Sequence, residues 1–190
     1  MSENPPEGRR SLWLIVALCV APVVASYVAF YVLPPARHTN YGELMNVSAL
    51  PNSPLRLVDG TPFELSSLRG KWILLMADPA RCAEACERKL FTLRQLRLTQ
   101  GKEMARIERA WLISDEGEIA PKLIDAVGGT WLLRAGGSEL IKHLPAERPV
   151  TDYIYVIDPL GNLVLRYASD AEPSRIIKDL TRLLKTSRIG

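Results

Sequence analysis

A single uninterrupted apolar segment divides this chain of 190 residues into two parts. Residues 11–33 (SLWLIVALCVAPVVASYVAFYVL) contain no charged side chain. As a helix this segment would be roughly 35 Å long, enough to cross a hydrocarbon layer of about 30 Å. Arg9 and Arg10 precede it and Arg37 follows it, so the positive-inside rule predicts that residues 1–10 are cytoplasmic. We therefore expect a single-pass protein of the inner (cytoplasmic) membrane with a periplasmic C-terminal domain.

A cleaved signal peptide is the alternative interpretation of the same segment. Val24-Ala25-Ser26 resembles a cleavage site, but the apolar segment continues to Leu33, beyond the length of a usual signal core. The length favours an uncleaved anchor, and both interpretations place the rest of the chain outside the cytoplasm. Cys19 lies within the segment and is expected to be a small membrane-embedded apolar residue.

The remaining sequence predicts a tether followed by one folded domain. Residues 34–54 are rich in proline, asparagine and small polar residues, which is typical of a linker, and His38 is expected to be a solvated residue within it. Residues 55–190 then form a domain of common size. The net charge of +3 gives no strong attraction to nucleic acid, so no nucleic-acid partner is expected.

Strand and helix patterns alternate along this domain. The run WILLMA at 72–77 is apolar at every position, as in a central strand buried on both faces. The order of elements predicts an α/β fold of thioredoxin-like layout. The expected strands are 55–58, 61–65, 72–77, 110–113, 130–133, 153–157 and 163–167, and the expected helices are 83–100, 118–127 and 173–184.

Cys82 and Cys86 carry the chemistry that the sequence suggests. They follow the predicted central strand after a short loop and open the next helix. A thiol at a helix N-terminus is stabilised as a thiolate by the helix dipole. Three interpretations stay open: a structural disulfide, a dithiol–disulfide redox centre, and a soft-metal site for Cu(I), which thiolates select. A disulfide across four residues restrains little of the unfolded chain, which weighs against a purely structural role.

The segment LRLVDGTPFELSSLRGKWILLMADPARCAEAC resembles the opening of Sco-type members of the thioredoxin superfamily. YIYVIDPLGNLVLRY is similar to their late hairpin, and the anchor with HTNYG resembles a smaller proteobacterial group. The resemblance implies a membrane-anchored factor for cytochrome c oxidase assembly that uses Cys82 and Cys86 as a thiol–disulfide reductant, a Cu(I) carrier, or both. Its implied partners are a cytochrome c oxidase subunit or other assembly factors.

The chain departs from this family at several positions. Ala83 and Glu87 stand where prolines are usual beside the family's cysteines. The family's copper-ligand histidine would fall at Val150, and the thioredoxin cis-proline would fall near Asp152. His143 is a third-ligand alternative, although an ordinary surface histidine is the more common case. Asp78 is expected to cap the turn before the cysteines rather than to orient a thiol proton.

The helix that carries the cysteines and the segment after it are rich in basic residues. They form either a solvated face, which is the usual case, or a surface for an acidic partner. A non-catalytic assembly factor with a vestigial or structural cysteine pair is therefore the alternative to a redox or copper function. The basic residues are Arg88, Lys89, Arg94, Arg97, Lys102, Arg106 and Arg109.

Overall fold

The computed structural model describes residues 7–32, 40–187 and 189, and the chain divides into two compact units, 1–39 and 40–190. In the first unit, helix α1 (Glu7–Val32) has 26 residues and contains Pro22. Within the described residues, Ser11–Ala29 is a helical stretch long and apolar enough to cross a membrane. Residues 34–39 of the predicted tether, including His38, lie outside the described part of the chain.

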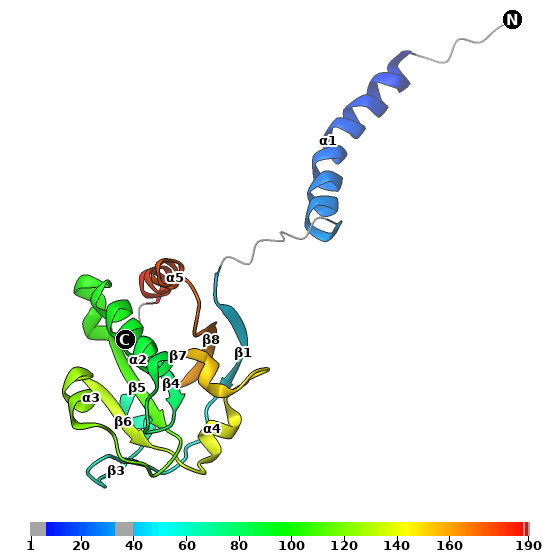
Figure 1. The fold of residues 1–190 in the computed structure, drawn as a ribbon. Coiled ribbons are helices and arrows are strands. Elements are labelled where there is room, and N and C mark those ends of the chain that lie inside the picture. Colours follow the sequence, from blue (N-terminus) through cyan, green and yellow to red (C-terminus); the bar gives the residue numbers. More distant parts are fainter. Residues whose placement is uncertain (1–6, 33–39, 188, 190) are drawn as a thin grey trace, which may run out of the picture. The chain divides into compact units, whose positions relative to one another are not determined.

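The second unit is built on one mixed sheet of eight strands in the order β1-β8-β7-β4-β5-β6-β2-β3 (Figure 1). β4 pairs in parallel with β5, and β5 with β6, while every other pair is antiparallel. The strands are β1 (Glu43–Ala49), β2 (Leu55–Leu57), β3 (Pro62–Phe63), β4 (Trp72–Asp78), β5 (Ile107–Ile113), β6 (Thr130–Arg134), β7 (Tyr153–Ile157) and β8 (Asn162–Ala168).

Helices cover both faces of this sheet. On one face, α2 (Glu84–Leu98), α3 (Pro121–Ala126) and α5 (Pro173–Thr186) pack over a core cluster that includes Trp111 of β5 (Figure 1). On the other face, α4 (Glu139–His143) packs over a second cluster that includes Tyr155 of β7. Short 3₁₀ turns η1, η2 and η3 span Leu65–Leu68, Gly101–Arg106 and Val150–Asp152.

The central strand β4 confirms the prediction from its continuous apolar sequence. All seven residues are buried. Because side chains alternate across a strand, Leu74 and Met76 join the cluster under α2, whereas Ile73 and Leu75 join the opposite cluster. β4 therefore fixes the position of the loop that follows it, and that loop carries Cys82.

The structure corrects the predicted tether at Glu43–Ala49, which forms the edge strand β1. β1 pairs with β8, and its side chains are mostly exposed, so no alternating apolar pattern marks it in the sequence. Glu43 instead forms an ion pair with the buried Arg166 across the strand pair, with Oε2 and Nε 3.0 Å apart. The predicted helix at 118–127 is also shorter, because α3 begins at Pro121, a residue favoured in the first helical turn.

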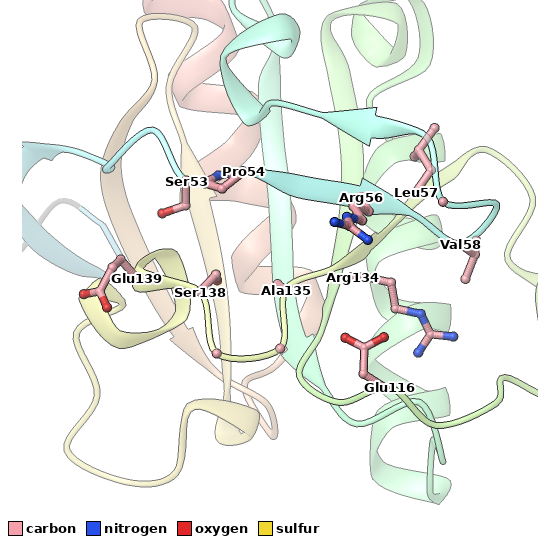
Figure 2. Close-up of a pocket in the computed structure, with 13 residues that line it drawn as sticks. Ser53, Pro54, Arg56, Leu57, Val58, Glu116, Arg134, Ala135, Ser138 and Glu139 are labelled. Atoms are coloured by element: carbon pink, nitrogen blue, oxygen red, sulfur yellow. The ribbon is translucent and has the colours of Figure 1, made fainter.

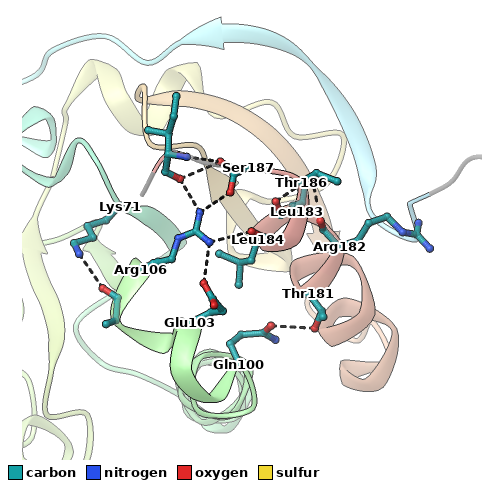
Figure 3. Close-up of polar contacts among 12 residues, drawn as sticks. Lys71, Gln100, Glu103, Arg106, Thr181, Arg182, Leu183, Leu184, Thr186 and Ser187 are labelled. Carbon is teal, nitrogen blue, oxygen red and sulfur yellow. Dashed lines mark hydrogen bonds and ion pairs between the residues drawn. The ribbon is translucent and has the colours of Figure 1, made fainter.

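Arg106 fastens the C-terminal end of α5 to the rest of the domain (Figure 3). Its guanidinium group donates to the carbonyl oxygens of Leu184 and Ser187 at 2.9 Å and of Ile189 at 2.8 Å, and it pairs with Glu103. The place of Arg106 in the basic run suggested a solvated face. The structure instead gives Arg106 a structural role within the domain.

Asp179 fixes the start of the second unit. This buried carboxylate on α5 accepts hydrogen bonds from the backbone N–H groups of Tyr41 and Gly42 at 2.7 and 2.9 Å, and from the hydroxyl of Tyr167 at 3.3 Å. Burial beside Asp179 raises the pKa of Tyr167. The segment that leads into β1 is thus held by the helix at the opposite end of the chain.

We predict that Asp179→Ala lowers the free energy of unfolding by about 2–3 kcal/mol, because two buried donors and one part-buried donor lose their acceptor. Urea unfolding of the full chain in detergent measures the change, and hydrogen exchange at β1 reports the release of its lead-in. The exposed Asp170 supplies the control, since Asp170→Ala removes the same charge without a buried partner. Equal effects of the two substitutions would contradict this account of Asp179.

Candidate functional site

The two cysteines lie where β4 gives way to α2. Cys82 precedes the helix, which starts at Glu84, and Cys86 lies in its first turn. They form a disulfide with their Cα atoms 5.3 Å apart. Cys82 stands outside the regular helix, so the disulfide links the loop before α2 to the first turn of the helix.

The two sulfur-bearing residues differ in exposure. Cys86 is 3% exposed and belongs to the core cluster under α2, whereas Cys82 is half-buried at the surface. A thiol or disulfide of another molecule can therefore approach Cys82 more readily than Cys86. Cys82 also lies beside the unpaired N–H groups at the start of α2, where a thiolate is stabilised. The arrangement suits an accessible attacking thiol with a sheltered partner.

Asp115 holds the loop that carries Cys82. Its Oδ1 accepts from the backbone N–H of Ala80 at 2.9 Å and from that of Gly117 at 3.2 Å. Ala80 is itself buried, and its carbonyl accepts from the N–H of Cys82 at 2.8 Å. The loop is thereby tied to the segment after β5. Sequence reasoning missed Asp115; its place just beyond a buried strand is the only signal for it.

A buried ion pair connects the end of β4 to α2. The ammonium group of Lys89 contacts the Asp78 carboxylate and also donates to the Thr151 carbonyl in η3. Lys89 and Asp78 are 2% and 6% exposed. Lys89 lies one turn after Cys86 in α2. This ion pair therefore joins α2, the end of β4 and η3, which precedes β7.

This pair corrects two expectations from the sequence. Asp78 does not cap the turn, since it belongs to β4 and its side chain is bound by Lys89. Lys89 does not belong to a solvated basic face, because it is buried. Its spacing signals this: Lys89 falls three residues after Cys86, beside the apolar positions that face the sheet.

Burial raises the pKa of Asp78 above its ordinary value, although Lys89 acts in the opposite direction. The folded protein then holds a proton on Asp78 more tightly than the unfolded chain does. The contribution of this group to stability is therefore full at low pH and is lost as pH rises through the raised pKa.

The other predicted site residues lie apart from the cysteine pair. Among the described residues, no group of three His, Cys, Asp or Glu side chains is placed to hold a metal ion, so His143 is not gathered with the cysteines. His143 is exposed on α4, with Nδ1 2.8 Å from the Glu139 carbonyl oxygen. Val150 packs against the core cluster on the face opposite that of Cys86. Asp152 ends η3, and the described backbone contains no cis peptide bond.

A separate hollow lies beside β2, the end of β6 and the loop that follows β6 (Figure 2). It has a volume of about 730 Å³, and Arg56 and Arg134, which are neighbours across the two strands, lie on one side of it. Glu116 and Glu139 also line it, which leaves the lining without a dominant charge. Neither cysteine contributes to this hollow, so it is not the site of the predicted chemistry.

Comparison with known proteins assigns the class. The family model "Transmembrane-like, thioredoxin-like, C-terminal domain" matches residues 72–187, and the chain belongs to that family. The fold is thus the thioredoxin-like α/β fold that the sequence predicts. A search of curated proteins finds no match.

Solved structures with the same fold include several Sco proteins. Yeast Sco1 with copper bound is 15% identical, with a TM-score of 0.60 over 75% of this chain and 96% of that one. A SCO1/SenC family lipoprotein from Bacillus anthracis is 19% identical, with a TM-score of 0.56 over 74% and 97%. The thioredoxin domain of a thiol-disulfide oxidoreductase from Bacteroides vulgatus is 17% identical, with a TM-score of 0.54 over 75% and 99%. At these identities the similarity establishes the fold.

We predict that the Asp78–Lys89 pair is strongly coupled. Lys89→Met and Asp78→Val alone each lower the free energy of unfolding by about 3 kcal/mol, because each leaves one buried charge unpaired. The double variant loses less than about 1 kcal/mol, since apolar groups replace both charges. Chemical unfolding at several pH values measures these free energies. In the parent, stability falls as pH rises above the ordinary pKa of aspartate, and in the double variant this fall should be absent, because Asp78 is gone. Additive losses would contradict the coupling.

Proposed function

We propose that this domain is a membrane-anchored thiol–disulfide reductant that acts in the assembly of cytochrome c oxidase. The observation that carries the proposal is the Cys82–Cys86 pair at the start of α2, with Cys82 accessible and Cys86 buried. The apolar helix α1 serves as an uncleaved anchor of the inner membrane, with residues 1–10 in the cytoplasm and the domain in the periplasm. An oxidising compartment outside the cytoplasm supplies disulfides for such a protein to reduce.

The exchange proceeds in two steps, and one cysteine sulfur of the domain is the attacking nucleophile in each. In the reduced protein, the Cys82 thiolate attacks a disulfide of the substrate, forms a mixed disulfide and releases one substrate thiolate. The Cys86 thiol then loses its proton and attacks the Cys82 sulfur, which releases the second substrate thiolate and closes the Cys82–Cys86 disulfide. Two electrons pass to the substrate, and a dithiol reductant in the same compartment must return them before the next cycle.

The assignment to oxidase assembly draws on the resemblance to Sco-type proteins in the cysteine segment and the late hairpin, and on the Sco folds among the solved structures. A cysteine-bearing copper site of an oxidase subunit must be reduced before it can take up metal, so such a subunit is the proposed substrate, with other assembly factors as further partners.

Cu(I) is a second cargo that the same two sulfurs can hold. Two thiolates suit a soft ion of low coordination number. Yeast Sco1 and the Bradyrhizobium japonicum ScoI were solved with copper bound. Here Val150 stands at the place of the family's histidine ligand and packs on the other face of the sheet, so we propose that this chain belongs to a branch that lacks this third ligand.

We predict that cells carrying Cys82→Ser/Cys86→Ser lose most of their cytochrome c oxidase activity while the protein level in the membrane is unchanged. The matched control is Cys19→Ser, which alters the free cysteine of α1. Oxidase activity in isolated membranes and an immunoblot measure the two quantities. Full activity of the double variant would overturn the reductant function and leave a non-catalytic binding factor.

We also predict that the reduced full chain in detergent takes up one Cu(I) and binds Cu(II) at least tenfold more weakly, because within the described part of the chain no histidine is gathered with the cysteines to complete a Cu(II) site. Competition with bathocuproine disulfonate measures the Cu(I) affinity, and Cys86→Ser should abolish it. His143→Ala should leave it unchanged, since His143 is not gathered with the cysteines. Tight Cu(II) binding that disappears in His143→Ala would contradict the missing-ligand proposal, and no Cu(I) binding would remove the carrier role.

A further inference from the structure

A groove lies between α2 and α3, and on α2 it begins at the residue that follows Cys86 in the chain. Its α2 wall follows one stripe of the helix: Glu87, the residue after Cys86, then Leu90, Phe91 and Arg94. Its α3 wall consists mainly of small and apolar residues. The groove has a volume of about 500 Å³. The residues of the α3 wall are Ala120, Lys122, Leu123, Ala126 and Val127.

The floor of this groove contains a buried arginine with an unused donor. Arg109 of β5 is 4% exposed, and its side chain points to the same sheet face as Ile107 and Trp111, where apolar residues normally stand. Its Nη2 donates to the Gly128 carbonyl at 2.8 Å, but its Nε has no hydrogen-bond partner. A buried guanidinium with an unpartnered nitrogen is costly. Nε itself is sealed from solvent, so a carboxylate from outside the domain would pair with the part of the guanidinium that lines the groove.

The charge around Arg109 is predominantly positive. Arg94 and Lys122 are exposed at the rims of the groove, and Glu87 is the only acidic residue that lines it. Burial, together with Arg97 and Arg94, lowers the pKa of Arg109, whereas Glu108 acts in the opposite direction. An incoming carboxylate would relieve this repulsion and pair with Arg109 in the geometry that guanidinium groups favour.

The groove is also apolar enough to hold a side chain. Phe91 is 64% exposed although it is a large aromatic residue, and it borders the buried Leu90 and Val127. An exposed aromatic at the rim of a groove with a buried arginine combines the two residue types that dominate protein–peptide contacts. The occupant that fits both features is a polypeptide segment with a carboxylate next to an apolar side chain.

We propose that this groove docks an acidic, apolar peptide segment of the protein whose disulfide or metal site the cysteine pair serves. A carboxylate of the segment meets Arg109, with Arg94 and Lys122 flanking it, and an apolar side chain covers Phe91. The docked segment ends beside Glu87, next to Cys86. The reason that such a segment reaches the domain depends on the proposed function. Its binding depends only on the residues of the groove.

Selection from a phage library of random dodecapeptides against the full chain in detergent tests the proposal. Empty micelles serve as the counter-selection. Selected peptides should combine Asp or Glu with aliphatic or aromatic residues, and their binding, measured by fluorescence anisotropy, should weaken as salt increases. Arg109→Gln should weaken the binding by about tenfold or more, the loss expected for one charged hydrogen-bonded contact.

Two variants at exposed positions test the proposal even if Arg109→Gln fails to fold. Arg94→Gln and Phe91→Ser should each weaken peptide binding several-fold, because they remove one charge and one apolar contact of the groove. Arg88→Gln removes the same charge from α2 outside the groove and should leave binding unchanged. No enrichment of acidic, apolar peptides, or equal binding by the parent, Arg94→Gln and Phe91→Ser, would overturn the proposal.

Binding to the Cys82→Ser/Cys86→Ser protein separates this proposal from the proposed function. Docking should persist in that protein, because no groove contact involves a cysteine. If docking persists but oxidase activity does not depend on the cysteines, the groove stands and the reductant function fails. If oxidase activity depends on the cysteines but no acidic, apolar peptide binds, the groove proposal fails alone.

Discussion

The buried ammonium group of Lys89 joins three segments that surround the cysteine pair. It contacts the Asp78 carboxylate at the end of β4 and the Thr151 carbonyl in η3, and it extends from the helix that begins beside Cys82. Because a buried charge is stable only while it is paired, the strand, the helix and the segment before β7 must keep one arrangement. The geometry of the two sulfurs therefore depends on an ion pair that never touches them.

Around this fixed centre the domain presents two different surfaces. Cys82 is the accessible part of the pair, whereas Cys86 is built into the core under α2. After Cys86 in the chain, the same helix forms one wall of the groove that contains Arg109, beginning at Glu87. One helix thus carries both the cysteine pair of the proposed function and the groove that we propose for an acidic polypeptide segment.

Most of the strands, and the placement of Cys82 and Cys86 between β4 and α2, could be predicted from the sequence because those features follow from local patterns. The apolar run of β4 and the spacing of α2 reflect burial directly. Edge strand β1 was missed because its side chains are mostly exposed and its stability comes from backbone pairing and from Asp179 on the last helix. The burial of Arg109 was missed because only tertiary packing shows that this basic residue points inward. Lys89 was missed because its charge outweighed the helical spacing that places it beside the apolar positions of α2.

Trapping of the mixed disulfide tests most directly whether Cys82 attacks the substrate and Cys86 then resolves the adduct. The full chain in detergent is reduced, freed of reductant and mixed with a fluorescein-labelled peptide dimer joined by one disulfide. Non-reducing electrophoresis and intact mass then report covalent adducts. Cys86→Ser should accumulate the peptide on Cys82, the parent should pass through the adduct to the Cys82–Cys86 disulfide, and Cys82→Ser should react far more slowly. Faster adduct formation on Cys86 in Cys82→Ser than on Cys82 in Cys86→Ser would contradict the account.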